Sequence, residues 1–426
     1  NINMSEEEGC FMSDYPNCHK LLICRSLLQD PAIQALGAVL DGDKSQTGVC
    51  AAKLIATAED VGLHGNLLRS YIIYLLVHDA NLAAQTIEVS NGPVGGSLKQ
   101  AFTHDLELLL PFLTNPASLY LDLPLLDDYE PTVRQQDEAS TALEALLKTA
   151  KTAEDYAKAL LSYYGSFGYG DIASFKAFRW DDKQQRLLGI RHFEAMQMDD
   201  IIGYAHQKEQ LIDNTEAFVQ RKPANNVLLV GARGTGKSSA VKALANVYYS
   251  RGLRILQLTK PQLSHLPDIM DALRYFASKR FIIFLDDLSF EESDAEYKYL
   301  KSAIEGGVES RPENVLIYAT SNRRHLIRES WRDRDSGKDE VYRDDSVNET
   351  ISLSDRFGLV IQYYAPDQKE YLAIIDHMLE KAGIKLSPEE LRIAGVRWEL
   401  THSGRSGRTA QQFVAHYLGQ IDNGEE

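Results

Sequence analysis

The chain has 426 residues and a formal net charge of −16, and 44% of its residues are hydrophobic. This length predicts two or three domains, each with its own buried core. Most of the excess acid precedes Ile201, so the two halves of the chain differ in charge. An acidic chain argues against broad, non-specific wrapping of nucleic acid, although a local basic patch would still permit a contact.

No uninterrupted apolar stretch approaches the length of a membrane span, so we expect no membrane segment and a cytoplasmic protein. The four cysteines lie at positions 10, 18, 24 and 50, three of them near His19. That cluster invites comparison with a zinc site. No two cysteines form a C-x-x-C pair, however, so we interpret them as reduced thiols.

Residues 1–195 predict a helical domain. Apolar residues recur three and four positions apart within residues 51–56, 67–77 and 106–110. Two further helices are expected over residues 138–149 and 152–164, the second with a capping arrangement at Thr152. Nothing in this half indicates chemistry, so we assign it to binding an unknown protein partner or substrate.

The pattern changes at about residue 196. After a predicted helix over residues 205–220, apolar runs occupy residues 226–230, 255–258, 281–285, 315–319 and 359–361. Short apolar strands separated by helices predict a parallel sheet covered on both faces. We therefore expect an α/β domain over residues 196–365. Residues 366–426 return to helical periodicity and predict a smaller helical domain.

A glycine-rich turn follows the first of these runs and leads directly into a predicted helix. Its sequence satisfies the G-x-x-x-x-G-K-[ST] pattern at every position. Glycines let the backbone wrap around a polyphosphate, and the start of a helix presents free N–H groups to the same anion. The strand before and the helix after disfavour a chance match. The residues expected to hold the phosphates are Gly231, Ala232, Arg233, Gly234, Thr235, Gly236, Lys237, Ser238 and Ser239.

Two residue types in this turn have specific expected roles. Lys237 is expected to reach the outer phosphates as a point charge, and the Ser238 hydroxyl to ligate magnesium. We see no Asn-Lys-x-Asp motif of the kind that reads guanine, which favours ATP over GTP.

Polar residues end two later strands. Asp286 and Asp287 follow the run 281–285, about fifty residues after the phosphate loop. We interpret Asp286 as the acid on the metal side, and Asp287 as the group that orients or deprotonates the attacking water. Asn322, or one of its neighbours Thr320 and Ser321, is expected to contact that water or the outermost phosphate. Helix capping and turn capping are the structural alternatives for these residues.

Two arginines complete the set. Arg356 lies just before the last apolar run, and Arg408 begins a predicted helix in the final segment. Guanidinium groups aimed at the outermost phosphate stabilise the charge that spreads over it as it leaves. Ion pairing at the surface is the alternative for each arginine.

These stretches, in this order, resemble the AAA+ superfamily of P-loop ATPases over about residues 196–425. The resemblance implies a five-stranded parallel sheet with a small helical lid, and ATP with Mg²⁺ bound between them near a neighbouring subunit. It places Asn322 at the first sensor, Arg356 at the arginine finger of a homo-oligomer and Arg408 at the second sensor. The segment that holds adenine in such proteins corresponds to Ile202, Gly203 and Tyr204, within residues 200–204.

More narrowly, residues 221–226, 286–291 and 319–325 resemble an uncharacterised bacterial family of AAA+-type ATPases with a helical amino-terminal region. Most members of the superfamily carry glutamate where Asp287 stands. Bacterial replication initiators and helicase loaders, to which this core is also similar, often have the Asp-Asp pair. Hydrolysis is therefore expected, and the shorter aspartate leaves open whether it is fast or slow.

We thus predict an ATPase that couples hydrolysis to a conformational change on an unknown partner. Two alternatives remain open: a nucleotide-gated binding switch with little turnover, and a nucleic-acid factor resembling an initiator or helicase loader. The segment from Arg323 to Arg343 mixes arginines with acids. A charged subunit interface is favoured for it over a nucleic-acid contact, because acids interrupt the arginines.

Overall fold

The structure is a computed structural model that describes residues 15–132, 137–291, 294–305, 311–322, 326–328, 353–402 and 404–422. The chain divides into two compact units. The first contains residues 1–175 with the short segments 250–252 and 275–279. The second contains residues 176–249, 253–274 and 280–426. The division at residue 175 comes before the predicted domain boundary at residue 195.

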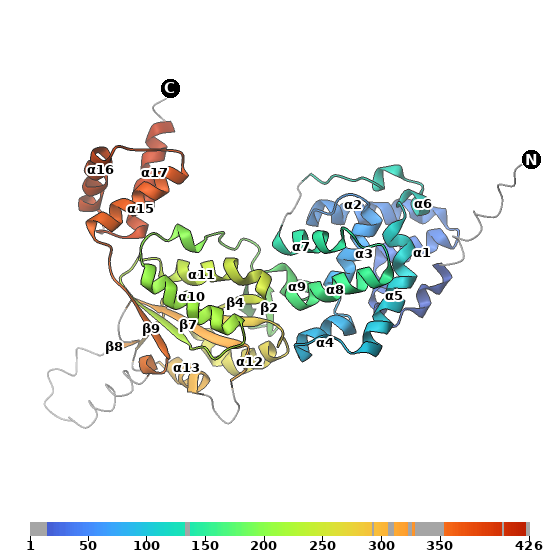
Figure 1. The fold of residues 1–426 in the computed structure, drawn as a ribbon, viewed down its shortest axis with the longest axis horizontal. Coiled ribbons are helices and arrows are strands. Elements are labelled where there is room, and N and C mark those ends of the chain that lie inside the picture. The colour runs from blue at the N-terminus through green and yellow to red at the C-terminus, as the bar shows by residue number, and fades with distance from the viewer. Residues whose placement is uncertain are drawn as a thin grey trace, which may run out of the picture. The chain divides into compact units, whose positions relative to one another are not determined.

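The first unit is helical in its described residues, as predicted (Figure 1). Its α-helices are α1 (Pro31–Leu40), α2 (Thr47–Val61), α3 (Leu67–His78), α4 (Leu82–Ser90), α5 (Gly96–Thr114), α6 (Ser118–Leu121), α7 (Glu138–Leu147), α8 (Ala153–Ser166) and α9 (Gly170–Ser174). The predicted capping box at Thr152 and Asp155 is present at the start of α8. Cys18, Cys24 and Cys50 are buried free thiols.

A buried carboxylate fixes the segment that precedes the first helices. Asp105 of α5 has no exposed surface and accepts hydrogen bonds from the backbone amides of Leu22, Ile23 and Cys24 at 2.7–2.8 Å. A buried carboxylate needs such donors, because its desolvation is otherwise uncompensated. The Asp105 side chain thereby supplies residues 22–24 with the acceptors that a helix or strand would otherwise provide for their backbone N–H groups.

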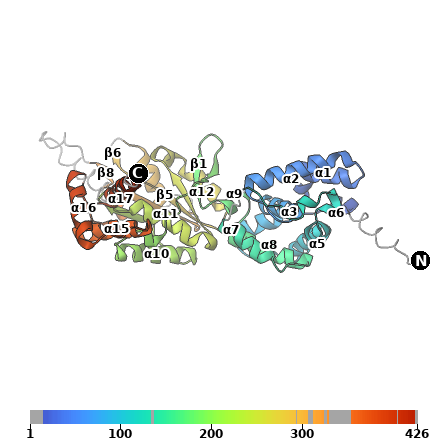
Figure 2. The ribbon, with the colours of Figure 1, turned by 90° about the horizontal axis from the view of Figure 1, so that it is seen from above.

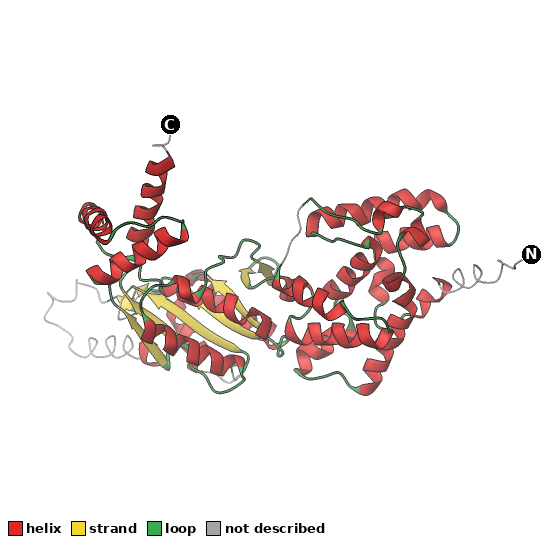
Figure 3. Ribbon diagram, turned by 45° about the horizontal axis from the view of Figure 1, so that its top comes forward, coloured by secondary structure: helices red, strands yellow, loops and turns green. Residues whose placement is uncertain are grey.

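The second unit is built on one mixed sheet in the order β2-β1-β4-β5-β7-β3-β9, which Figure 3 shows in yellow. Its strands are β1 (Ala177–Asp181), β2 (Arg186–Gly189), β3 (Val227–Gly231), β4 (Leu253–Leu258), β5 (Arg280–Leu285), β7 (Val315–Ser321) and β9 (Leu359–Tyr363); β6 (Phe290–Glu291) and β8 (Ile327–Arg328) form a separate pair. The five predicted parallel strands are confirmed. The predicted number of strands is wrong, because β1 pairs in parallel with β4 and carries the antiparallel strand β2.

Helices cover both faces of this sheet, with α10 (Ala205–Val219) and α11 (Lys237–Tyr248) on one face and α12 (Leu266–Arg274) and α13 (Glu296–Glu305) on the other (Figure 2). Strand β5 shows why: all six of its residues are buried. Its Ile282 and Phe284 pack in the core shared with α10 and α11, while the alternate residues point to the opposite face.

Three helices follow the sheet: α15 (Gln368–Lys381), α16 (Pro388–Thr401) and α17 (Gly407–Asp422). Capping boxes begin α15 and α16, at Asp367 and Ser387. Apolar residues of all three helices form a separate small core around Tyr371 and Phe413. The predicted helical lid is therefore present as a three-helix cluster in the second unit.

Among the described residues, no helix is long and apolar enough to cross a membrane.

Candidate functional site

The phosphate loop joins the end of β3 to the start of α11, as the sequence pattern predicts. Its lysine turns back onto the loop. The Lys237 amino group donates to the carbonyls of Gly231 at 2.9 Å and Ala232 at 2.7 Å, and to Oδ1 of Asn322 at 3.2 Å. The lysine is buried, so the loop is shaped around a cation that its own carbonyls partly compensate.

Two glycines of the loop occupy backbone conformations that exclude a side chain. Gly231 has a φ of +141°, and a Cβ there would lie 1.8 Å from the carbonyl oxygen of Tyr363 in β9. Gly234 has a φ of +71°, and its carbonyl accepts a hydrogen bond from the Gly407 amide at the start of α17. The loop therefore lies directly against the neighbouring strand and the lid, which glycine alone permits.

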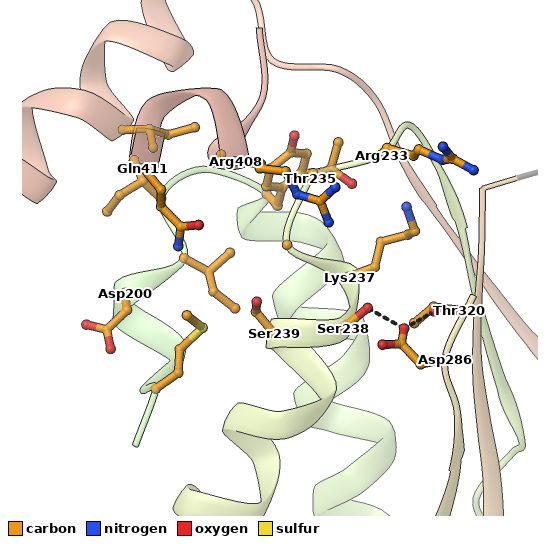
Figure 4. A pocket seen from close by; sticks show the side chains of 18 of the residues that line it. Asp200, Arg233, Thr235, Lys237, Ser238, Ser239, Asp286, Thr320, Arg408 and Gln411 are labelled. Atoms are coloured by element: carbon orange, nitrogen blue, oxygen red, sulfur yellow. Dashed lines mark hydrogen bonds between the residues drawn. The ribbon is translucent and has the colours of Figure 1, made fainter. Parts of the chain in front are cut away.

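The acid pair ends β5 beside this loop. Asp286 accepts two hydrogen bonds on its Oδ1, from the Ser238 hydroxyl at 2.5 Å and from the Thr320 hydroxyl at 2.7 Å (Figure 4). Thr320 also accepts a hydrogen bond from the Asp287 backbone amide at 2.9 Å. One buried hydroxyl at the end of β7 thus fixes both acids. The sequence suggested Thr320 only as a substitute for Asn322.

Asp287 has a left-handed backbone, with a φ of +51°. Its carboxylate accepts a hydrogen bond from the Asn322 side-chain amide, whose oxygen in turn accepts from Lys237. A non-glycine residue in this conformation is held there by its surroundings, and the amide bond to Thr320 supplies that constraint. Lys237, Asn322 and Asp287 therefore form one hydrogen-bonded chain across the ends of neighbouring elements.

Burial and the neighbouring carboxylates shift the pKa of Lys237 in opposite directions. Burial lowers the pKa of its amino group, the carboxylates of Asp287 and Asp286 raise it, and the nearby guanidinium of Arg233 lowers it. The loop thus holds its lysine in a partly desolvated position, where a further anion would favour the charged form.

A cavity of about 520 Å³ opens over the loop. Most of the predicted residues line it, namely Ile202, Tyr204, Arg233, Gly234, Thr235, Gly236, Lys237, Ser238, Ser239, Asp286, Asp287, Asn322 and Arg408. Gly203, Gly231, Ala232 and Arg356 are not among its lining residues. Phosphate loop, acids and lid therefore meet around one space, as the order of the motifs predicts.

The segment before α10 forms one wall of the cavity. The Tyr204 hydroxyl donates to the Tyr364 carbonyl at 2.7 Å, and its ring lies 5.0 Å from that of Tyr363. Asp200 accepts hydrogen bonds from the side chain of Lys381 in α15 and from the Gln197 amide. The side chains of Asp200 and Tyr204 are thus engaged in holding the segment in place, and Ile201 and Ile202 add apolar surface to the lining of the cavity.

The lid supplies lining residues that the sequence did not predict. Ile374 and Met378 come from α15. Gln411 comes from α17, one turn after Arg408 (Figure 4). Met196 lines the cavity as well. The spacing offered a signal: residues four apart on α15, and three apart on α17, lie on one helix face.

Arg356 lies elsewhere. Its guanidinium forms an ion pair with Glu305 at the end of α13, at 2.7 Å. The alternative of ion pairing within the chain is thus observed for this arginine, and its expected role toward a neighbouring subunit stays a prediction. Arg323, Arg324 and the rest of the predicted insertion over residues 323–343 lie outside the described residues, except residues 326–328.

Comparisons with known proteins bear on the family and the fold of this chain. The family model described as "Protein of unknown function (DUF815)" matches residues 173–421. The replication factor C small subunit of Haloarcula marismortui is 26% identical over 141 residues, covering 31% of this chain and 41% of that protein. The strand order β9-β3-β7-β5-β4 with a phosphate loop after β3 accords with the predicted AAA+ resemblance, which is confirmed at the level of the fold.

Solved structures similar to this chain include the RuvB Holliday junction branch migration motor of Thermotoga maritima. It is 17% identical with a TM-score of 0.38, and the match covers 54% of this chain and 66% of that one. A mutant of the same protein gives 17% identity and a TM-score of 0.39, covering 54% and 67%.

Proposed function

This chain belongs to the family described as protein of unknown function DUF815, and we propose that it is an ATPase. One observation carries the proposal: the hydroxyls of Ser238 and Thr320 converge on one carboxylate oxygen of Asp286, beside a loop built around Lys237. A hydroxyl and a carboxylate at the foot of a phosphate loop are the arrangement that nucleotide hydrolysis requires.

The residues present fit magnesium. Hydroxyl and carboxylate oxygens are ligands that Mg²⁺ prefers, and Ser238 and Asp286 already bring one of each into contact. These two residues would hold the ion. When bound, Mg²⁺ would neutralise part of the charge on the phosphates.

The chain's own residues would then divide the work. Lys237 would exchange its carbonyl partners for the outer phosphate oxygens, and the loop amides would surround the inner ones. Asp287, held by Asn322, would orient the attacking water and accept its proton. Arg408 at the start of α17 would stabilise the transferring phosphoryl group from within the same chain.

The adenine would lie against the apolar wall. Ile202 belongs to the segment before α10, while Ile374 and Met378 come from the lid. Apolar side chains on two elements suit the two faces of a planar base, with few polar groups to fix its orientation.

Arg356 would act on the nucleotide of a neighbouring copy in a homo-oligomer. Its ion pair with Glu305 means that this role requires either release of the arginine or approach of the partner's nucleotide to the pair. Coupling of hydrolysis to an unknown protein partner through the helical first unit completes the proposal.

A nucleotide-gated switch with little turnover is the second candidate. It is favoured by Asp287, a shorter acid than glutamate, whose carboxylate is occupied by the Asn322 amide. Binding without hydrolysis would leave this contact in place.

The test is ATP turnover per subunit over a hundredfold range of protein concentration. Wild type is compared with Lys237→Ala, Arg356→Ala and the control Arg397→Ala, an exposed lid arginine outside the cavity. Turnover that rises with concentration and is lost in the first two variants supports an ATPase that works between subunits. ATP binding with no turnover at any concentration favours the switch. Absence of binding by wild type overturns both.

A further inference from the structure

Arg233 occupies the middle of the phosphate loop with an exposed side chain, and it lines the cavity. Figure 4 labels it on the same loop as Lys237, with Arg408 entering from the lid. No hydrogen bond or ion pair of its guanidinium is found among the residues that the structure describes. A cation without a partner at the rim of an anion site is a candidate for direct contact with the ligand.

We propose that Arg233 contacts the outermost phosphate of ATP from within the same chain and so makes the site select a nucleoside triphosphate over a diphosphate. This inference rests on the proposed function, which it deepens by assigning the group that recognises the terminal phosphate.

The backbone on either side of Arg233 is fixed. The preceding Ala232 carbonyl accepts hydrogen bonds from Lys237 at 2.7 Å and from the Thr235 hydroxyl at 2.9 Å. The following Gly234 carbonyl accepts from the Gly407 amide at 2.7 Å. A side chain presented from a pinned backbone loses less freedom on binding than one on a mobile loop, so Arg233 is suited to recognition.

Charge balance supports a third cation. Three acids line the cavity, Asp200, Asp286 and Asp287. Asp200 is already paired with Lys381 of α15, so only Asp286 and Asp287 offset positive charge beside the phosphate loop. With Lys237 and Arg408 alone, the two acids would cancel the two cations before any phosphate is counted. With Arg233, the cavity carries an excess of positive charge. This charge attracts a triphosphate more strongly than a diphosphate, because the triphosphate carries one more charged group.

The electrostatics of Lys237 are consistent with this proximity. Arg233 is one of the charges that act on its amino group, with a sign opposite to that of the two carboxylates. A terminal phosphate between the two cations would relieve their mutual repulsion. The planar guanidinium also offers paired N–H donors that match phosphate oxygens, which a lysine cannot do.

Within its own chain, the predicted finger Arg356 cannot supply the same contact without a rearrangement. It is tied to Glu305 of its own chain and does not line the cavity. Arg233 needs neither a second copy nor the breaking of an ion pair. Recognition of the terminal phosphate is therefore expected even at concentrations where the protein is a monomer.

The experiment measures dissociation constants for ATP and for ADP, each with Mg²⁺, on wild type, Arg233→Gln, Arg233→Lys and the control Arg397→Gln. Loss of a charged hydrogen bond predicts at least a tenfold weaker affinity for ATP in Arg233→Gln, with ADP changed by less than about twofold. Arg233→Lys should fall between, because it keeps the charge and loses the paired donors. Arg397→Gln should match wild type for both nucleotides.

Equal losses for ATP and ADP, or no loss for either, would overturn the inference while leaving the proposed function intact. Wild type that binds neither nucleotide would instead overturn the proposed function. Mixing Arg233→Gln with Lys237→Ala protein separates the two routes by which the arginine reaches phosphate. Restored ATP affinity in the mixture would mean that Arg233 acts on a neighbouring copy, contrary to the assignment within one chain.

Discussion

A buried ion pair in the first unit gives the sharpest prediction of stability. The side chain of Lys279 has no exposed surface, and that of Glu88 in α4 is nearly as buried; the amino group lies 3.0 Å from the carboxylate. The same amino group donates to the Ser278 hydroxyl at 2.7 Å and to the carbonyls of Tyr164 and Gly165 at 3.1 and 3.2 Å. The amino group of Lys279 thus has hydrogen-bond and ion-pair partners for all its donors at a site with no exposed surface.

Lys279→Met keeps the length of the side chain and removes its charge and donors. The Glu88 carboxylate would keep only the Ser278 hydroxyl as a side-chain donor, and two backbone carbonyls would lose theirs. Removing one partner of a buried pair costs about 3–5 kcal/mol, because the remaining charge stays buried without compensation. We expect a loss of this size in the free energy of unfolding. The double variant with Glu88→Leu should lose less than Lys279→Met alone, since it leaves no unpaired charge.

The assay is urea unfolding followed by two probes. Trp180, Trp331 and Trp398 all lie after the first unit's main segment, so tryptophan fluorescence reports on the second unit. Far-ultraviolet circular dichroism reports on the helices of both. The lower midpoint should appear chiefly in the dichroism signal. The control is Lys385→Met, whose side chain is 84% exposed and which should change stability by about 0.5 kcal/mol at most. A loss below about 1 kcal/mol in Lys279→Met, or a double variant less stable than the single one, would refute the reasoning from burial.

Two further substitutions test hydroxyl and carboxylate contacts. Thr320→Val keeps the shape of the side chain but removes the hydroxyl that joins the Asp286 carboxylate to the Asp287 amide. We expect ATP turnover to fall about tenfold with ATP affinity little changed, and Thr320→Ser to recover most of it; unchanged turnover would count against this positioning role. Asp105→Asn places an amide nitrogen or a single acceptor before the three backbone N–H groups of residues 22–24. Urea unfolding should show a loss of about 2 kcal/mol, and a loss near zero would contradict the need for the carboxylate.

Short sequence patterns predicted the parts of the fold that are determined by residues close together in the sequence. The phosphate loop, the acid pair after β5 and the lid helices all follow from short motifs and from apolar periodicity. Helix α16 lies within the segment 366–426 that was predicted to be helical, and it begins where it does because Ser387 caps its start and proline fits its first turn. The buried strands were recognisable because a parallel sheet is covered on both faces and its strands are apolar throughout.

The hairpin of β1 and β2 was not predicted, because the sequence pattern that indicates it is short. Phe178 and Trp180 alternate with polar residues, which is typical of a strand, but charged residues follow within two positions. Pairing with β4 places these residues beside a strand that begins at Leu253, and no local pattern records that neighbour. The sixth and seventh strands therefore depend on a contact distant in sequence.

Contacts distant in sequence also explain the features of the site that the sequence did not predict. The Thr320 hydroxyl became important because β7 lies beside β5, so that it reaches both acids. From the sequence alone, the charged side chains of Arg356 and Lys279 would be expected to face water. Their partners, Glu305 and Glu88, are fixed only by the packing of the elements that carry them.

The partners that the cations have in this structure bear on how much each contributes to nucleotide affinity. Lys237 already donates to two carbonyls and to Asn322, so binding a phosphate exchanges existing hydrogen bonds for new ones. The net gain from such an exchange is a fraction of the gross interaction. Arg233 and Arg408 line the cavity, and their side chains make no hydrogen bond or ion pair with the described residues, so they would give up only water on binding a phosphate. On the proposed function, Lys237 would therefore keep the loop in shape before nucleotide arrives, and the two arginines would supply the larger share of selectivity for the terminal phosphate.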